Sequence, residues 1–358
     1  MEILAQAARL EWALPMKTLS CLLLLSLAVL TACVTLPEDE PAVSTQAQPA
    51  DLPARTVHLA AVGDIADCRT EKGAAARATG DLLRTRFPGV TVLALGDLVY
   101  ENGTSAEFAN CYHRVWRELR ERTRPAPGNH DYGIYIPVRR NTADPYFRYF
   151  GTRAGPPGKG FYSFDLGAWH IVSLNSMAGG VAAAPSTQEQ TEWLETDLAE
   201  TRQPCLLAYW HHPLFSSGHH GYDSADPGRR TDALWQGLAR HGTDVIVNGH
   251  DHHYERFAPQ TPDGRADRAG IREFVVGTGG ARIRPVQRAQ PNSEAILDDP
   301  GDHGVLLLTL HPGSYEWQWI RTDGSIGDRS EEPQACHGIG NLSMRGGFGG
   351  DDRIRTGE

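Results

Sequence analysis

The sequence carries little positive charge and lacks the short motifs of several familiar enzyme classes. Its 358 residues include 34 lysines and arginines against 44 aspartates and glutamates, a formal net charge of −10. This balance argues against non-specific nucleic-acid binding, which needs a basic surface, but a bound metal could still attract a small anionic substrate. Gly-x-Ser-x-Gly and P-loop patterns are both absent, so the sequence gives no sign of a serine-hydrolase elbow or a nucleotide-binding loop.

Long hydrophobic runs and internal repeats are also scarce. The apolar share of 40% and the charged share of 22% are ordinary for a globular chain, which excludes wholesale disorder. The one long apolar run, Leu19–Ala32, has 14 residues and follows Met16-Lys17. A basic segment before so short a run is typical of a signal peptide rather than a membrane-spanning helix. We therefore predict a signal segment over residues 1–32, with Met16 as the true start and residues 1–15 outside the protein.

The end of this run resembles a bacterial lipobox. The residues are Leu30-Thr31-Ala32-Cys33, and in a lipobox the cysteine is lipidated and becomes the new N-terminus. We predict a lipid anchor on Cys33 and a place in the bacterial cell envelope, periplasmic or at the cell surface. The alternative is an ordinary cleaved signal peptide with a chance cysteine. The composition predicts a flexible tether over residues 33–55 and a disordered Gly-rich tail over 338–358.

Cysteine is used sparingly, and none of the six cysteines has the Cys-x-x-Cys spacing of a structural zinc site. Once Cys21 is removed and Cys33 lipidated, four remain, which suggests two disulfides in an exported protein. Three pairings can be drawn. We favour Cys68–Cys111 and Cys205–Cys336, because Cys68 and Cys111 both follow predicted strand ends near the proposed site.

Apolar runs and helical spacing predict one folded domain over residues 56–337. Strands are expected at 56–62, 90–95, 161–165, 169–174, 205–210, 244–248, 272–277, 304–310 and 315–320. Helices are expected at 71–86, 105–120, 187–201 with a threonine cap, and 231–241. Alternating strands and helices followed by a strand-rich end predict a layered α/β sandwich.

Polar side chains follow the apolar runs at five places. The segments are Gly63-Asp64, Gly96-Asp97-Leu98-Val99-Tyr100, Gly128-Asn129-His130-Asp131, Trp210-His211-His212-Pro213 and Asn248-Gly249-His250-Asp251-His252. In an open α/β sheet the carboxyl ends of the strands meet at one edge, where ligand sites form. A preceding glycine lets the backbone come close to an ion. Carboxylates together with imidazoles suit zinc, iron or manganese better than calcium.

The order of these motifs resembles the calcineurin-like metallophosphoesterase superfamily, and in detail its purple acid phosphatase branch. That branch has an Asp motif followed by GDxxY, GNH(D/E), VxxH and GHxH, and the resemblance covers residues 57 to about 280. Two departures, Ala66 for the usual Gly and Ala208 for Val, remove no ligand. The resemblance implies a layered α/β/β/α sandwich with the active site at the carboxyl-terminal ends of the strands.

The resemblance also implies a ligand set for two metal ions, iron paired with zinc, manganese or a second iron. The first ion would be held by Asp64, Asp97, Tyr100 and His252, and the second by Asp97, Asn129, His211 and His250. Asp97 is shared, since a carboxylate has enough lone pairs to bridge two cations.

Tyr100 distinguishes the purple branch from the wider superfamily. There the first motif is usually Asp-x-His and its histidine binds the first metal, but Ala66 stands at that position here. A Tyr100 phenolate is the expected replacement and favours trivalent iron. The alternative is that Tyr100 is a packed aromatic at a strand end.

Three histidines are candidate catalytic residues. His130 resembles the family residue that contacts the substrate phosphate and helps to protonate the leaving oxygen, although it could instead hydrogen-bond Asp64 or Asp131. His219 and His220 lie where related enzymes place substrate-contacting histidines, or else are exposed turn residues.

Four other polar residues near the motifs are assigned supporting roles. His212 and His253 neighbour predicted ligands, and we expect them to pack or to support those ligands. Glu255 and Arg256 are expected to form a local ion pair.

The resulting functional hypothesis is an exported phosphomonoesterase that uses a metal-bound hydroxide as the nucleophile. A phosphodiesterase with the same site is the second hypothesis, and a non-catalytic metal-dependent binding lipoprotein is the alternative from another class. The sequence does not identify the substrate, the native metals or the oligomeric state.

Overall fold

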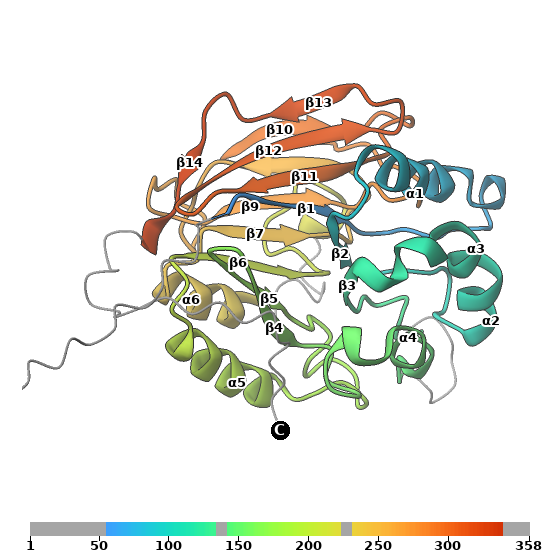
Figure 1. The fold of residues 1–358 in the computed structure, drawn as a ribbon, viewed down its shortest axis with the longest axis horizontal. Helices are drawn as coiled ribbons and strands as arrows, with labels where there is room; N and C mark the ends of the chain where they lie inside the picture. The colour runs from blue at the N-terminus through green and yellow to red at the C-terminus, as the bar shows by residue number, and fades with distance from the viewer. Residues whose placement is uncertain (1–54, 134–141, 223–230, 339–358) are drawn as a thin grey trace, which may run out of the picture. The chain divides into compact units, whose positions relative to one another are not determined.

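The computed structural model describes residues 55–133, 142–222 and 231–338, which form two β-sheets and their helices (Figure 1). These residues all fall within one compact unit, Gln48–Glu358. The predicted signal segment, Cys33, nearly all of the predicted tether and nearly all of the predicted tail lie outside the described residues. Among the described helices, none combines the length and apolarity needed to cross a membrane.

The first sheet has seven strands and combines the N-terminal and C-terminal parts of the described chain. Six strands lie in the order β13 (Ile326–Arg329), β12 (Ser314–Arg321), β11 (Gly304–Leu310), β1 (Val57–Val62), β2 (Thr91–Leu95) and β3 (Thr123–Ala126), and β14 (Gln334–Ala335) pairs with β12. Strands β1, β2 and β3 are parallel, whereas β11 runs antiparallel to β1 with Val57 opposite Leu310. The carboxyl ends of β1, β2 and β3 therefore share one edge.

The second sheet also has seven strands and is built from the middle of the chain. Its order is β10 (Ser293–Leu297), β8 (Tyr254–Phe257), β9 (Arg272–Val276), β7 (Val245–Asn248), β6 (Cys205–Trp210), β5 (Trp169–Ser173) and β4 (Tyr162–Leu166). Strands β5, β6, β7 and β9 are parallel. The strands expected at 161–165 and 169–174 are present as the antiparallel pair β4 and β5, with Gly167 at φ 61° in the turn between them.

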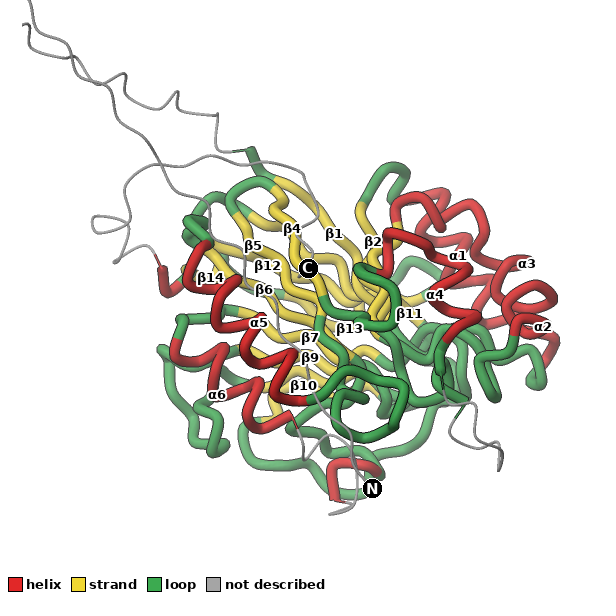
Figure 2. Tube along the Cα trace, turned by 90° about the horizontal axis from the view of Figure 1, so that it is seen from below, coloured by secondary structure: helices red, strands yellow, loops and turns green. Residues whose placement is uncertain are grey.

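The strands of the two sheets lie between two groups of helices, as Figure 2 shows. Helices α1 (Ala74–Arg86), α2 (Ser105–Glu107), α3 (His113–Trp116) and α4 (Asp144–Phe150) accompany the first sheet, and α5 (Thr187–Glu200) and α6 (Asp232–Arg240) the second. Along β1, Leu59 and Ala61 pack between the sheets, whereas Ala60 and Val62 pack beneath the helices. Because such a strand is buried on both faces, its sequence is a continuous apolar run. The predicted α/β/β/α sandwich is confirmed.

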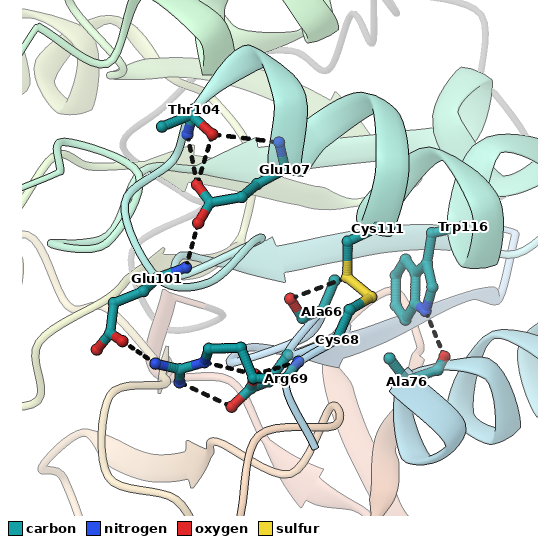
Figure 3. Close-up of a disulfide and its surroundings, with 10 residues drawn as sticks. Ala66, Cys68, Arg69, Ala76, Glu101, Thr104, Glu107, Cys111 and Trp116 are labelled. Atoms are coloured by element: carbon teal, nitrogen blue, oxygen red, sulfur yellow. Dashed lines mark hydrogen bonds and ion pairs between the residues drawn. A yellow bond between two sulfur atoms is a disulfide. The ribbon is translucent and has the colours of Figure 1, made fainter. Parts of the chain in front are cut away.

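The predicted helix over residues 105–120 is present but irregular. A π-helical segment, Phe108–Tyr112, separates α2 from α3, and a 3₁₀ segment, Arg117–Arg122, follows. Its start is well capped, because Thr104 Oγ1 accepts from the main-chain N of Glu107 at 3.2 Å while the Glu107 carboxylate accepts from the N of Thr104 at 2.8 Å (Figure 3). The π-helical turn aims Cys111 at the loop that follows β1.

Both favoured disulfides are present. Cys68 pairs with Cys111 across a Cα–Cα distance of 5.8 Å (Figure 3), and Cys205 pairs with Cys336 across 5.5 Å. The expectation that Cys111 follows a strand end was wrong, because Cys111 lies in the π-helical turn. Cys68 reaches it because the loop after β1 passes beneath that turn, where Cys111 also approaches the carbonyl oxygen of Ala66.

Several short elements differ from the prediction. The helix cap of α5 is Ser186, whose Oγ accepts from the N of Glu189 at 3.0 Å, and not a threonine. Strand β3 contains Arg124 and Pro125 and was not recognised as a strand. Helix α4 consists largely of aromatic residues with modest helix propensity, and burial of its side chains explains its presence better than its local sequence does.

Candidate metal centre

The five polar segments singled out in the sequence meet where the two sheets come together. Asp64 follows β1, Asp97 follows β2, and Asn129 follows β3, all in the first sheet. His211 and His250 follow β6 and β7 in the second sheet. The sheets are joined at this edge by main-chain hydrogen bonds, such as the one from the N of Gly63 to the O of Val276 at 2.9 Å.

Glycine is needed at this meeting point for steric reasons. At Gly96, with φ 83°, an added Cβ would lie 2.6 Å from the His211 ring. At Gly249 it would lie 2.7 Å from Asp64 Oδ2. Any side chain at either position would therefore push a predicted ligand out of place.

Three predicted ligands adopt a backbone conformation that L-residues rarely use. Asp64, Asp97 and His250 have φ of 58°, 49° and 72°. The left-handed conformation costs roughly 1 kcal/mol or more for a residue with a Cβ. Strain of this kind collects at functional sites, where the surroundings impose it, and here it turns all three side chains toward the same place.

The predicted ligands of the first metal form one buried group. Tyr100 Oη donates to Asp64 Oδ1 at 2.8 Å and lies 3.1 Å from His252 Nε2. His252 Nε2 is 3.3 Å from Asp64 Oδ1. His252 Nδ1 donates to the carbonyl oxygen of Arg282 at 2.9 Å, so its Nε2 lone pair faces the group.

The predicted ligands of the second metal converge on His211. Its Nδ1 donates to the carbonyl oxygen of Leu95 at 2.8 Å, which turns Nε2 toward the site. That atom lies 3.0 Å from Asn129 Oδ1, 3.2 Å from His250 Nδ1 and 3.2 Å from Asp97 Oδ2. All four side chains are buried.

Asp97 connects the two groups. Asp64, Asp97 and His211 each place a ligand atom within 4.8 Å of the others. The Asp64 and Asp97 carboxylates, buried and this close, would repel each other without a positive charge nearby, and the amide, phenol and imidazole groups around them are also metal donors. The donor set therefore fits two transition-metal or zinc cations that share Asp97.

The electrostatics of the metal-free site support this fit. Burial would raise the pKa of Asp97, but His211 and His130 hold it below its ordinary value. Burial opposes protonation of His211, yet Asp97 raises its pKa to about 9. Burial and the Asp64 carboxylate raise the pKa of Tyr100 well above 10. Without cations, the proton on His211 offsets part of the carboxylate charge, and Tyr100 stays a neutral phenol that donates to Asp64.

His130 lies over the shared carboxylate. Its Nδ1 donates to the carbonyl oxygen of Glu101 at 2.6 Å, and its Nε2 is 3.7 Å from Asp97 Oδ2. The ring packs 4.3 Å from the Tyr100 ring, centroid to centroid. Burial lowers the pKa of His130. The structure thus brings His130 to the centre, with Nε2 on the side of the Asp97 carboxylate.

The two loop histidines are placed differently. His220 is half-buried, and its ring centroid lies 4.0 Å from that of His250. His219 is exposed, and its ring contacts that of His220 at 5.1 Å. Only His220 is therefore packed against a predicted metal ligand.

The neighbours of the ligands have the supporting contacts that were expected. His212 Nδ1 lies 2.7 Å from Ser176 Oγ, and its ring is 4.2 Å from that of His250. His253 Nε2 lies 3.0 Å from the Glu255 carboxylate.

The expected ion pair between Glu255 and Arg256 is wrong. Consecutive strand residues point to opposite faces, so Arg256 pairs with Asp328 at 2.8 Å on one face. Glu255 lies on the other face, where it accepts from the N of Ser217 at 2.8 Å and from Ser217 Oγ and Ser293 Oγ at 2.5 and 2.6 Å.

The loop of His219 and His220 is anchored by two carboxylates, Asp251 and Glu255. Sequence reasoning did not identify this role. Glu255 holds Ser217, and Asp251 accepts from Ser216 Oγ at 2.5 Å and from the N of His220 at 3.2 Å. The available signal was their position, because Asp251 lies between His250 and His252, and Glu255 follows His253 by two residues. They fix His220 on His250 although neither reaches the centre itself.

Comparison with known proteins finds a matching family model and similar purple acid phosphatases. Residues 57–254 match the family model of the calcineurin-like phosphoesterases. Purple acid phosphatase 15 of Arabidopsis thaliana is 30% identical over 292 residues, which cover 71% of this chain and 52% of that protein. Purple acid phosphatase 21 of the same plant is 30% identical over 179 residues, 48% of this chain and 39% of that protein. The chain spans about half the length, or less, of these curated relatives.

Solved structures share the fold. Purple acid phosphatase PPD1 from yellow lupin seeds superposes with a TM-score of 0.62 at 20% identity, over 77% of this chain and 53% of that one. GAP50, the anchor in the inner membrane complex of Plasmodium, gives 0.57 at 12% identity, over 81% and 93%. At these sequence identities, the structural match shows only that the fold is shared.

Proposed function

The chain belongs to the calcineurin-like phosphoesterase family, in its purple acid phosphatase-like branch, and on that basis we propose that it is an exported phosphomonoesterase with a two-metal centre. The cluster of Asp64, Asp97 and His211 carries the proposal, because it joins both predicted ligand groups through one buried carboxylate. A predicted ligand is present at every motif, which favours turnover over mere metal binding.

The chain's own residues have distinct roles in this proposal. When bound, the two cations supply Lewis acidity to a phosphoryl group and lower the pKa of the attacking water. Asp97 sets the separation of the two ligand groups. His130 keeps its Nδ1 proton on the Glu101 carbonyl, so Nε2 can take up a proton and pass it to the departing alkoxide. His219 and His220 would contact the substrate, with His220 the better placed.

The test is hydrolysis of p-nitrophenyl phosphate against bis(p-nitrophenyl) phosphate by protein whose metals are measured by elemental analysis. We expect faster turnover of the monoester. Faster turnover of the diester would favour a phosphodiesterase. Two bound metals without hydrolysis of either ester would favour the binding lipoprotein and overturn the proposal.

A variant of the shared carboxylate tests the site itself. Asp97→Asn should lose bound metal and lower the rate on the order of a thousandfold, because an amide supplies less charge between two cations. Asp263→Asn is the matched control, since Asp263 is exposed and pairs locally with Arg265. Full activity and two metals in Asp97→Asn would show that the ligand assignment is wrong.

Export through a lipid anchor on Cys33 is part of the same proposal. Two disulfides in the folded domain fit an oxidising compartment. In detergent phase separation, wild-type protein should enter the detergent phase and Cys33→Ser the aqueous phase. A mature N-terminus at another residue, found by mass spectrometry, would remove the anchor from the proposal.

A further inference from the structure

Arg284 is held beside the first group of predicted ligands. Its main-chain N donates to the carbonyl oxygen of His252 at 2.9 Å, and His252 Nδ1 donates to the carbonyl oxygen of Arg282 at 2.9 Å. Ile283, between the two arginines, is buried. Two hydrogen bonds and one buried side chain therefore fix the backbone from which the Arg284 side chain starts.

The Arg284 side chain reaches the second group. Its Nη1 donates to His220 Nε2 at 3.2 Å. The His220 ring in turn packs on His250 with centroids 4.0 Å apart and planes inclined by 39°. One imidazole ring thus separates the Arg284 guanidinium from a predicted ligand of the second metal. The guanidinium therefore lies near the segments that carry the predicted ligands of the first metal and of the second metal.

The charge of Arg284 is available, unlike that of Arg69, another arginine near the centre. Arg69 lies 5.9 Å from the Tyr100 ring centroid, but it forms an ion pair with Asp67 and a second one with Glu101, which is labelled in Figure 3. Arg284 is exposed, and it makes no ion pair with a carboxylate of the residues that the structure describes. In a chain of net charge −10, an uncompensated cation beside a catalytic centre points to an anionic ligand.

We propose that Arg284 and His220 form a subsite for a second anionic group of the substrate. The preferred substrates are then phosphate esters whose leaving group carries a further phosphate or carboxylate. A guanidinium binds either anion through two parallel N–H donors, and the hydrogen bond to His220 uses only one of its five. This subsite rests on the proposed phosphoesterase function, which would act on the first phosphate at the metals.

The kinetic test compares phenyl phosphate with the ortho, meta and para isomers of carboxyphenyl phosphate. Wild type and Arg284→Gln are assayed with equal measured metal content. For at least one isomer, Arg284→Gln should lower kcat/KM about tenfold, mostly through KM, because the variant loses one charged contact with the carboxylate. A tenfold change corresponds to about 1.4 kcal/mol. For phenyl phosphate the change should stay below about twofold.

The matched control is Arg268→Gln. Arg268 is exposed and precedes β9, whose first residue pairs with Val245 at the start of β7. It therefore lies at the edge of the sheet opposite the centre, and this variant should behave as wild type with every substrate.

A binding measurement gives a readout that does not depend on turnover. Titration calorimetry with methylenediphosphonate and with methylphosphonate should show that Arg284→Gln weakens only the first, again about tenfold.

Each outcome separates the two proposals. If wild-type protein does not hydrolyse phenyl phosphate, the proposed phosphoesterase function is wrong. If wild type hydrolyses it and Arg284→Gln lowers kcat/KM equally for all substrates, Arg284 acts by positioning His220. That equal loss, or no loss at all, overturns the subsite.

Discussion

His170 should make the stability of this protein depend on pH between about 6.5 and 9. The side chain is fully buried within β5, with Nδ1 2.7 Å from Asp165 of β4 and Nε2 2.8 Å from Asp197 of α5. Burial disfavours the imidazolium, but the two carboxylates raise the pKa of His170 to about 9. The charged ring therefore joins a helix to two strands of the second sheet.

The magnitude follows from linkage. A shift from about 6.5 to about 9 corresponds to about 3 kcal/mol of unfolding free energy, because each pKa unit is worth about 1.4 kcal/mol. Since the folded-state pKa is raised, this stability is fully present below about pH 6.5 and is lost as the pH rises through about 9. Within that window the folded state binds one more proton than the unfolded chain, so stability should fall by about 1.4 kcal/mol per pH unit.

The assay is urea unfolding of chelator-treated, oxidised protein from about pH 6 to about pH 10. Other groups titrate over the same range, so the diagnostic quantity is the difference between wild type and His170→Gln. That difference should shrink by about 3 kcal/mol across the range. His58→Gln is the control, because His58 is exposed, and its profile should run parallel to wild type. Parallel profiles for His170→Gln would mean that His170 is neutral in the fold.

Two further predictions concern the centre and its supporting loop. Iron-loaded, oxidised protein should show a visible charge-transfer band, because a phenolate bound to ferric iron absorbs visible light. Tyr100→Phe should remove this band while the fold is kept. An unchanged band in the variant would mean that another residue is the absorbing ligand. Glu255→Gln should cost roughly 2 kcal/mol of unfolding free energy, since the buried carboxylate accepts from Ser217 and Ser293, and should raise KM by loosening the histidine loop. A variant with lowered stability but unchanged KM would contradict the positioning role of Glu255.

Most of the strands that were recognised from sequence are buried on both faces, and β12, whose residues are only alternately buried, is an exception. Residues of β6 alternate between the core beneath α5 and α6 and the core between the sheets, as Ala208 and Tyr209 do. Both environments require apolar residues, so the whole strand stands out in the sequence. Strands β10 and β13 are half-exposed at sheet edges, and nothing in their composition sets them apart from loops.

The residues of the candidate centre could be identified for a similarly local reason. Each predicted ligand lies within a few residues of the carboxyl end of a strand, often after a glycine that a neighbouring ligand makes obligatory, as Gly96 is beside His211. The chemistry and the backbone requirement are therefore encoded together in a short motif. The residues that complete the site have no such local signature, because Arg284 acquires its role only by reaching His220 across 64 residues of chain.

His219 and His220 show where local sequence stops being sufficient. The two are adjacent and chemically identical, so any argument from motif or spacing treats them alike. In the structure one ring packs on His250 and the other is exposed. The choice is made by Asp251 and Glu255, which hold the loop through hydrogen bonds to residues 31 and 38 positions earlier in the chain. A sequence pattern specifies which donors are present, but long-range hydrogen bonds between buried groups decide which of them faces the centre.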